Sequence, residues 1–163
     1  MEEADLLRQI QKLMKAGRTW MLKEKDGRKR ARALVHLARA AIEDGQPRYV
    51  TAVAASDACI NLAGASIFQR WTARTKAVIR DSRILTTRNL VAAIPDDGPR
   101  FLFSASGIGY YGDRGDETLT ETAEAGSDFL ARLGIEWEAE AEAAGRKGVR
   151  VVCGRLGVVL HQG

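Results

Sequence analysis

The spacing of hydrophobic positions along the chain changes near Tyr49. Before that point, residues 2–16 and 28–43 each place apolar side chains at helical spacing and predict a helix. After it, short apolar runs alternate with long amphipathic stretches, which is typical of a parallel β-sheet packed against helices. The sequence therefore predicts an α/β fold with a parallel sheet of three to four strands and flanking helices, preceded by two N-terminal helices.

Three apolar runs predict the strands, at residues 58–63, 101–105 and 149–153. The first run is continuous rather than alternating in its hydrophobicity, as expected for a strand that is buried on both faces. Residues 158–160 predict a short further strand or a bent continuation of the third.

Two amphipathic segments predict the helices between these strands. Thr72 is the expected cap of the first helix, which ends at Ile94, and Ser127 is the expected cap of the second, which spans residues 128–146. The expected inner face of the first helix consists of Val78, Ile79, Leu85, Leu90, Val91 and Ile94. The acidic residues 113–126 contain two glycines and three threonines and predict a surface loop.

The net charge of +4 is distributed unevenly along the chain. Residues 1–50 hold twelve Lys/Arg against seven Asp/Glu, whereas residues 51–163 hold thirteen against fourteen. Such a basic segment can bind nucleic acid or another acidic partner. A solvated helix face or a linker is favoured here, because Trp20 is the only aromatic residue within the basic cluster at residues 18–32. Binding to nucleic acid is therefore not expected.

The sequence contains no apolar stretch long enough to predict a membrane span, and its N-terminus does not resemble a signal peptide, so a cytoplasmic location is expected. Cys59 and Cys153 each lie in an apolar run and are expected to be buried free thiols. The two histidines, His36 and His161, lie far apart, and no metal site is expected.

Gly107, Gly109 and Gly112 match the G-x-G-x-x-G pattern directly after a predicted strand. In a dinucleotide-binding turn the third glycine opens a helix whose amides face the pyrophosphate. Here an acidic, glycine-interrupted segment follows instead. The pattern is therefore interpreted as a loop.

Five motifs in unbroken order over about residues 56–163 suggest a family: DACINLAG, RWTARTKAVIRDSRILTTRNLVAAI, FLFSASGIGYYGDRGDE, DFLARLGIEWEAEA and VRVVCGRLGVVL. Together they resemble the atypical extended short-chain dehydrogenase/reductases, the sugar-nucleotide epimerase-like proteins. The resemblance implies a partial NAD(P)-binding Rossmann domain over residues 49–163, with NADP or NAD as cofactor. Residues 1–48 form a basic segment, expected to be helical, in which no motif of the family is found.

The resemblance also implies site residues. Asn61, Leu62, Ala63 and Gly64, with Ser104 and Ala105, correspond to positions that line the cofactor. An ordinary strand-to-loop turn is the alternative interpretation of the first four.

Ser106 resembles the family's catalytic serine, and Tyr111 resembles the aromatic residue beside the nicotinamide, which gives two expected catalytic residues. Arg155 resembles an arginine near the substrate and is the expected substrate-binding residue. A loop tyrosine and a surface charge are the alternatives for Tyr111 and Arg155.

Two departures from the family pattern limit the functional prediction. The chain contains no Tyr-x-x-x-Lys pair, in which a lysine makes the tyrosine a usable base; Leu133 and Trp137 are the residues expected in its place. Residues 1–50 contain no glycine-rich phosphate turn. The sequence therefore predicts an incomplete NAD(P)-dependent epimerase/dehydratase-like domain for a sugar-nucleotide or similar alcohol. The alternative is a non-catalytic interaction protein that uses its basic N-terminal helices or self-associates through an open sheet edge.

Overall fold

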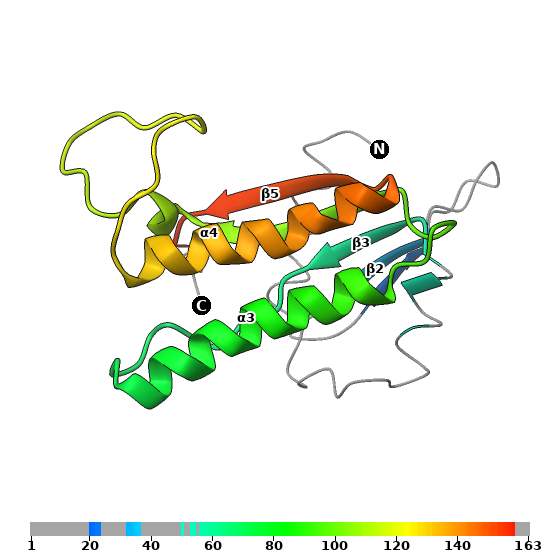
Figure 1. Cartoon of the computed structure of the whole chain (residues 1–163), viewed down its shortest axis with the longest axis horizontal. Coiled ribbons are helices and arrows are strands. Elements are labelled where there is room, and N and C mark those ends of the chain that lie inside the picture. Colours follow the sequence, from blue (N-terminus) through cyan, green and yellow to red (C-terminus); the bar gives the residue numbers. More distant parts are fainter. Residues whose placement is uncertain (1–19, 24–31, 37–49, 51–52, 55, 159–163) are drawn as a thin grey trace.

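The computed structural model describes residues 20–23, 32–36, 50, 53–54 and 56–158. These residues form one five-stranded sheet with two long helices packed on it (Figure 1). The strands are β1 (Trp20–Lys23), β2 (Arg32–His36), β3 (Ala58–Asn61), β4 (Phe101–Gly107) and β5 (Arg150–Leu156). The α-helices are α3 (Ala73–Ala93) and α4 (Phe129–Glu142), and the short 3-10 helices are η1 (Ile108–Tyr111) and η2 (Ala143–Lys147).

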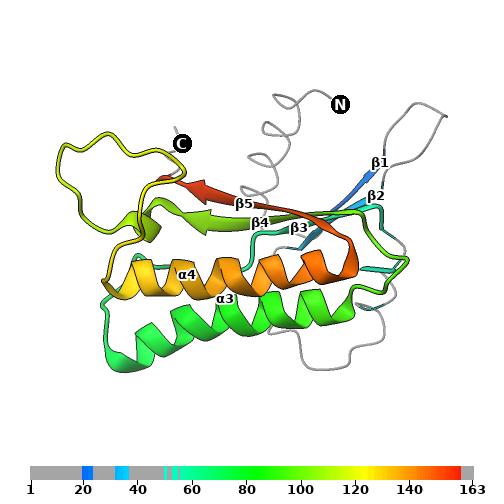
Figure 2. The same ribbon diagram turned by 45° about the horizontal axis from the view of Figure 1, so that its top comes forward.

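The strands lie in the order β1-β2-β3-β4-β5. β1 pairs antiparallel with β2, and β2 through β5 are parallel. The β3-α3-β4 and β4-α4-β5 connections step in the same direction across the sheet, so right-handed crossovers place both helices on the same face. Figure 2 shows α3 and α4 side by side on that face. The predicted α/β fold with a partial, Rossmann-like parallel sheet is confirmed.

The N-terminal third differs from its prediction where the structure describes it. Strand β2 occupies residues 32–36, inside the helix predicted at 28–43, so that prediction is wrong for these five residues. β1 lies in the polar stretch for which no element was predicted. β2 forms because its backbone pairs with β3, a contact between distant segments that a local pattern does not reveal. The helix predicted at 2–16 lies outside the described residues.

The ends of the two helices are fixed by side chains. The Thr72 hydroxyl accepts a hydrogen bond from the Thr75 amide, as predicted. The second helix is capped by Asp128, whose carboxylate accepts from the Ala131 amide at 2.8 Å, rather than by the predicted Ser127. The Lys147 ammonium donates to the carbonyls of Val91, Ala92 and Ile94 and closes the end of α3.

The inner face of α3 is rotated relative to the predicted one. Val78 and Leu85, both expected to face inward, are 50% and 45% exposed. They lie two turns apart on one side of the helix, which faces solvent. Their place is taken by Ile84 and by the hydroxyl residues Thr86 and Thr87, which are buried. The inner face of α3 is therefore partly polar.

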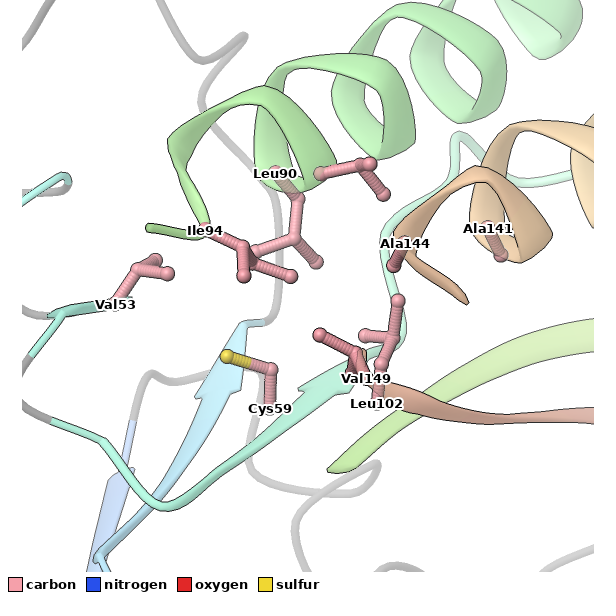
Figure 3. Packing of buried hydrophobic residues seen from close by; sticks show 9 residues of the cluster. Val53, Cys59, Leu90, Ile94, Leu102, Ala141, Ala144 and Val149 are labelled. Atoms are coloured by element: carbon pink, nitrogen blue, oxygen red, sulfur yellow. The ribbon is translucent and has the colours of Figure 1, made fainter. Parts of the chain in front are cut away.

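The main apolar core lies near the amino ends of the strands (Figure 3). Cys59 and Leu102 from the sheet pack there against Leu90 of α3, the C-cap residue Ile94 and Ala141 of α4. A second cluster lies nearer the carboxyl ends and comprises Ile79, Ile84, Ala105, Leu133 and Trp137. The two helices thus cover an apolar half and a mixed half of the sheet.

Both cysteines are free thiols within this fold. Burial raises the pKa of Cys59 to about 12. The pKa of Cys153 is also raised to about 12, first by burial and then by the carboxylates of Glu138 and Glu142. The folded protein therefore holds these thiols protonated at a pH at which an unfolded chain, with thiols at the ordinary value of 9.0, has lost the proton.

We predict that alkaline pH destabilises the protein through these thiols. Between pH 9 and about 12 the folded state binds more protons than the unfolded state, so the free energy of unfolding falls as pH rises. The contribution is about 1.4 kcal/mol per pH unit for each thiol. Urea denaturation across this range measures it. In Cys59→Ala the free energy of unfolding should fall less steeply with pH, by the contribution of one thiol. An unchanged slope would contradict the prediction.

Candidate functional site at the carboxyl edge of the sheet

The strand register brings the predicted site residues together. Asn61 of β3 pairs with Ser104 of β4, and Ser106 of β4 pairs with Arg155 of β5. Alternate residues of a strand share a face, and the carboxyl ends of parallel strands meet at one edge of the sheet. These four side chains therefore gather at the carboxyl edge, on the side covered by α3 and α4.

Asn61 is the centre of a buried hydrogen-bond network. It is 0% exposed, and its side-chain NH₂ donates to the Thr87 hydroxyl at 2.8 Å and to the Ser104 hydroxyl at 3.3 Å. Its carbonyl oxygen accepts from the Ala63 amide at 3.2 Å. The Thr87 hydroxyl accepts a second bond from the Trp137 indole at 2.9 Å. The Asn61 side chain therefore shapes the turn after β3 from within.

The turn after β3 is held against α3. The Ser82 hydroxyl accepts from the Ala65 amide at 2.9 Å, and the Arg83 guanidinium donates to the Ala65 carbonyl at 3.0 Å. That guanidinium lies 5.1 Å from the Trp137 ring centre, and burial lowers its pKa. A side chain at Gly64 would place its Cβ 2.7 Å from Arg83 Cζ. Gly64 therefore leaves room for the guanidinium.

Ser106 contacts a carboxylate that the motifs did not point to. Its hydroxyl donates to Glu138 Oε1 of α4 at 2.6 Å, and both residues are buried. Arg155 donates to the same carboxylate in two places, from Nε to Oε1 at 2.9 Å and from Nη2 to Oε2 at 2.8 Å. The hydrogen bond to Glu138 is the largest of the interactions that raise the pKa of Arg155. This is a two-point ion pair beneath the carboxyl edge.

The same guanidinium holds Tyr111. Arg155 Nη1 donates to the Tyr111 hydroxyl at 2.8 Å and to the Glu121 carbonyl at 2.9 Å. Its planar face lies 3.5 Å from the Tyr110 ring centre. Ser106 and Tyr111 are thus connected through Glu138 and Arg155, and the arrangement offers two hydroxyl groups that can bond a polar ligand.

The remaining predicted cofactor residues lie beside this network. Ala63 and Ala105 are buried, and Leu62 packs on the second apolar cluster. Leu62 and Gly64 keep part of their surface exposed. Because Gly64 has no side chain, its main chain is partly accessible at the edge of the sheet, whereas Asn61 and Ser104 are buried.

The glycines of the G-x-G-x-x-G pattern serve packing and chain reversal. A Cβ at Gly109 would lie 3.0 Å from Leu130 Cβ, and Gly112 has φ +69° and ends the short helix η1. The chain comes back to η1 at Gly126, whose amide donates a hydrogen bond to the Tyr110 carbonyl. The segment between is a closed loop, as predicted.

The face of α4 that meets this loop differs from the one expected to replace Tyr-x-x-x-Lys. Leu133 and Trp137 lie in the second apolar cluster. The positions that contact Gly109 and Tyr110 are Leu130 and Gly134, which are also four residues apart. Neither pair contains a group that exchanges a proton.

Sequence reasoning missed Glu138, Thr87 and Arg83. Glu138 lies in a run of alternating glutamates, which locally resembles a solvated face. Its spacing was the available signal: it follows Gly134 by four residues and precedes Ala141 by three, which places it toward the buried side of the helix. Thr87 and Arg83 occur in a helix rich in polar residues, and nothing local distinguishes them.

The fold is that of a Rossmann-type α/β protein. Comparison with known families is more specific: residues 8–160 match the NAD dependent epimerase/dehydratase family. The chain belongs to this family. The matched range begins at residue 8, whereas the motifs that carry the resemblance begin at about residue 56.

Relatives and solved structures agree with this assignment. The epimerase family protein Mb2239 of Mycobacterium bovis is 46% identical over 105 residues, covering 64% of this chain and 35% of that protein. The structure of human epimerase family protein SDR39U1 (isoform 2) with NADPH aligns with a TM-score of 0.61 and 32% identity, over 70% of this chain and 42% of that one. A nucleoside-diphosphate sugar epimerase from Corynebacterium glutamicum aligns with a TM-score of 0.56 and 36% identity, over 65% of this chain and 23% of that one.

The chain thus spans about a third of the length of the curated relatives it matches, 35% in the case of the Mycobacterium bovis protein. Within the described residues, neither long helix is apolar enough to span a bilayer.

We predict that Thr87→Val destabilises the protein by roughly 2–4 kcal/mol, because it leaves two buried donors, on Asn61 and Trp137, without their acceptor while nearly preserving volume. Urea denaturation measures the loss. Thr118→Val, at an exposed position of the loop after η1, is the matched control and should change stability by less than about 0.5 kcal/mol. Equal effects of the two changes would show that the network does not stabilise the edge.

Proposed function

We propose that this chain forms part of an NAD(P)-dependent epimerase/dehydratase-like enzyme that acts on a sugar-nucleotide or a similar alcohol. The observation that carries the proposal is the connection of Ser106 to Tyr111 through Glu138 and Arg155 at the carboxyl edge. Ligands of open α/β sheets bind outside this edge. The family match and the NADPH named with the human relative support the same cofactor class.

The residues at the edge fit the adenosine half of a dinucleotide in one respect. The Asn61 side chain is engaged with Ser104 and with Thr87, so it shapes the edge without blocking it. The partly exposed main chain at Gly64 can approach a ribose closely. When bound, the nicotinamide would supply the hydride acceptor. Residues 1–50 contain no G-x-x-G-x-x-G turn for the pyrophosphate, so weak binding by this chain is expected.

The proposed catalytic pair is Ser106 and Tyr111. Ser106 would bond the substrate oxygen at the carbon that exchanges hydride, and Tyr111 would lie beside the nicotinamide. Arg155 uses Nε, Nη1 and Nη2 within the chain, which engages four of the five N–H groups of a guanidinium. One Nη2 hydrogen remains for the substrate-binding role proposed for this residue.

We predict that the chain binds NADPH saturably and that this binding depends on the turn after β3. A titration monitored by nicotinamide fluorescence measures the affinity. Gly64→Ala places a Cβ against the Arg83 guanidinium, which must shift and loosen its hydrogen bond to the Ala65 carbonyl, and should weaken binding roughly tenfold, or about 1.4 kcal/mol. Gly145→Ala is the matched control, because a Cβ there meets nothing within 4 Å. Salt-sensitive binding of RNA without any binding of NADPH would instead favour the non-catalytic interaction protein.

A further inference from the structure

Arg83 carries a partly buried positive charge that pairs with no carboxylate among the described residues. Its guanidinium donates from Nη1 to the carbonyls of Ala65 and Ile79, both at 3.0 Å. The Trp137 ring centre lies 5.1 Å from its Cζ atom. Burial lowers the pKa of Arg83, because desolvation penalises the cation, but an arginine remains charged in a protein. The fold therefore keeps a desolvated cation beside the turn after β3.

The other arginines that join α3, α4 and the sheet have their charges balanced. Each of them pairs with a glutamate: Arg80 with Glu136, Arg88 with Glu140 and Arg155 with Glu138. Arg155 does so through Nε and Nη2, whose adjacent N–H groups match the two oxygens of a carboxylate or a phosphoryl group. In Arg83 the same two nitrogens have no hydrogen-bond partner in the part of the chain that the structure describes. We call these two nitrogens of Arg83 the open fork.

The open fork lies against Gly64, at the carboxyl edge of the sheet. A Cβ at Gly64 would lie 2.7 Å from Arg83 Cζ, 2.9 Å from Nη2 and 3.1 Å from Nε. Because glycine has no Cβ, the two nitrogens border a turn that keeps part of its surface exposed. Two carbonyls hold Nη1, so the guanidinium is fixed in place before a ligand arrives.

We infer that the open fork of Arg83 binds a phosphoryl group of a nucleotide. Two adjacent N–H donors on a fixed guanidinium match two phosphoryl oxygens, and the bound anion supplies the negative charge that the surroundings lack. Residues 58–80, which include the turn, contain four Lys/Arg and no Asp/Glu, so the local charge favours an anion. The inference rests on the proposed function, because the dinucleotide and the sugar-nucleotide named there both carry phosphates.

The open fork is tested in the unaltered protein by NMR of the arginine Nε–H groups. Titration with inorganic pyrophosphate should shift the Arg83 Nε–H signal saturably, because Nε is one of the two donors. Arg74 is the internal control, since it is exposed and lies about two and a half turns earlier, on the opposite side of α3. An Arg83 signal that does not move, or that moves no more than the Arg74 signal, overturns the inference.

The two-point contact is tested with Arg83→Lys, which keeps the positive charge and removes the fork. The ratio of the affinities for ADP and for adenosine should fall at least about tenfold, because only ADP carries the phosphates. Arg74→Lys is the matched control and should leave the ratio unchanged. Equal losses of ADP and adenosine binding would show that Arg83 only supports the turn, and would overturn the inference. If Arg83→Lys does not fold, the pyrophosphate titration, which needs no variant, decides.

The source of the phosphate is identified by titrating the same Nε–H signal with NADPH and with UDP-glucose. The nucleotide whose phosphate occupies the open fork should shift the Arg83 signal. A shift with pyrophosphate and with neither nucleotide would overturn the assignment to a nucleotide. If nicotinamide fluorescence shows no binding of NADPH while UDP-glucose still shifts the Arg83 signal, the NAD(P)-dependent function is refuted and the phosphate site stands.

Discussion

Burial of polar side chains at the carboxyl edge is the constraint on which the arrangement of this protein depends. Parallel pairing of β3, β4 and β5 places Asn61, Ser104, Ser106 and Arg155 on the face that the helices cover. Each of these groups must find a partner there, because an unpaired buried polar group costs about 1–3 kcal/mol. α3 supplies Thr87 and α4 supplies Trp137 and Glu138. The two helices are therefore fixed by directional bonds as well as by packing.

This constraint explains why the apolar and polar parts of the interface are separated along the strands. Leu90, Ile94 and Ala141 pack over the amino half of the sheet, where Cys59 and Leu102 present apolar surface. The carboxyl half carries the hydrogen-bonded groups and a smaller apolar cluster. One half holds the helices on the sheet, and the other half sets their position at the edge where ligands of such folds bind.

The features that the sequence predicted correctly are those encoded over short distances. Continuous apolar runs indicated β3, β4 and β5, and Thr72 with the following periodicity indicated α3. Strand β2 was missed because the short apolar run at residues 33–35 satisfies helical and extended spacing equally, and only pairing with β3 decides between them.

The sequence predicted the site residues that lie on or directly after the strands, but not their hydrogen-bond partners on the helices. Motifs named Ser106, Tyr111 and Arg155, but the partners that orient them come from α4 or from the opposite side of a loop. Glu138 is one of four alternating glutamates, and Glu136 and Glu140 do pair with exposed arginines of α3. Their chemistry is identical, so only the rotation of α4 about its axis, set by tertiary packing, determines which one reaches Ser106.

The desolvation cost of the Glu138–Arg155 ion pair indicates what the pair contributes to the protein. Removing two charges from water costs several kcal/mol per ion, and a buried pair is often no more stabilising than apolar residues of the same size. Stability alone therefore gives little reason for a carboxylate and a guanidinium at this position, where the neighbouring cluster of Ile84, Leu133 and Trp137 shows that apolar packing is available. An ion pair does provide what apolar side chains cannot, which is a fixed direction for the protons of two nearby hydroxyl groups. The pair is thus better explained by the orientation of Ser106 and Tyr111 than by the stability of the fold.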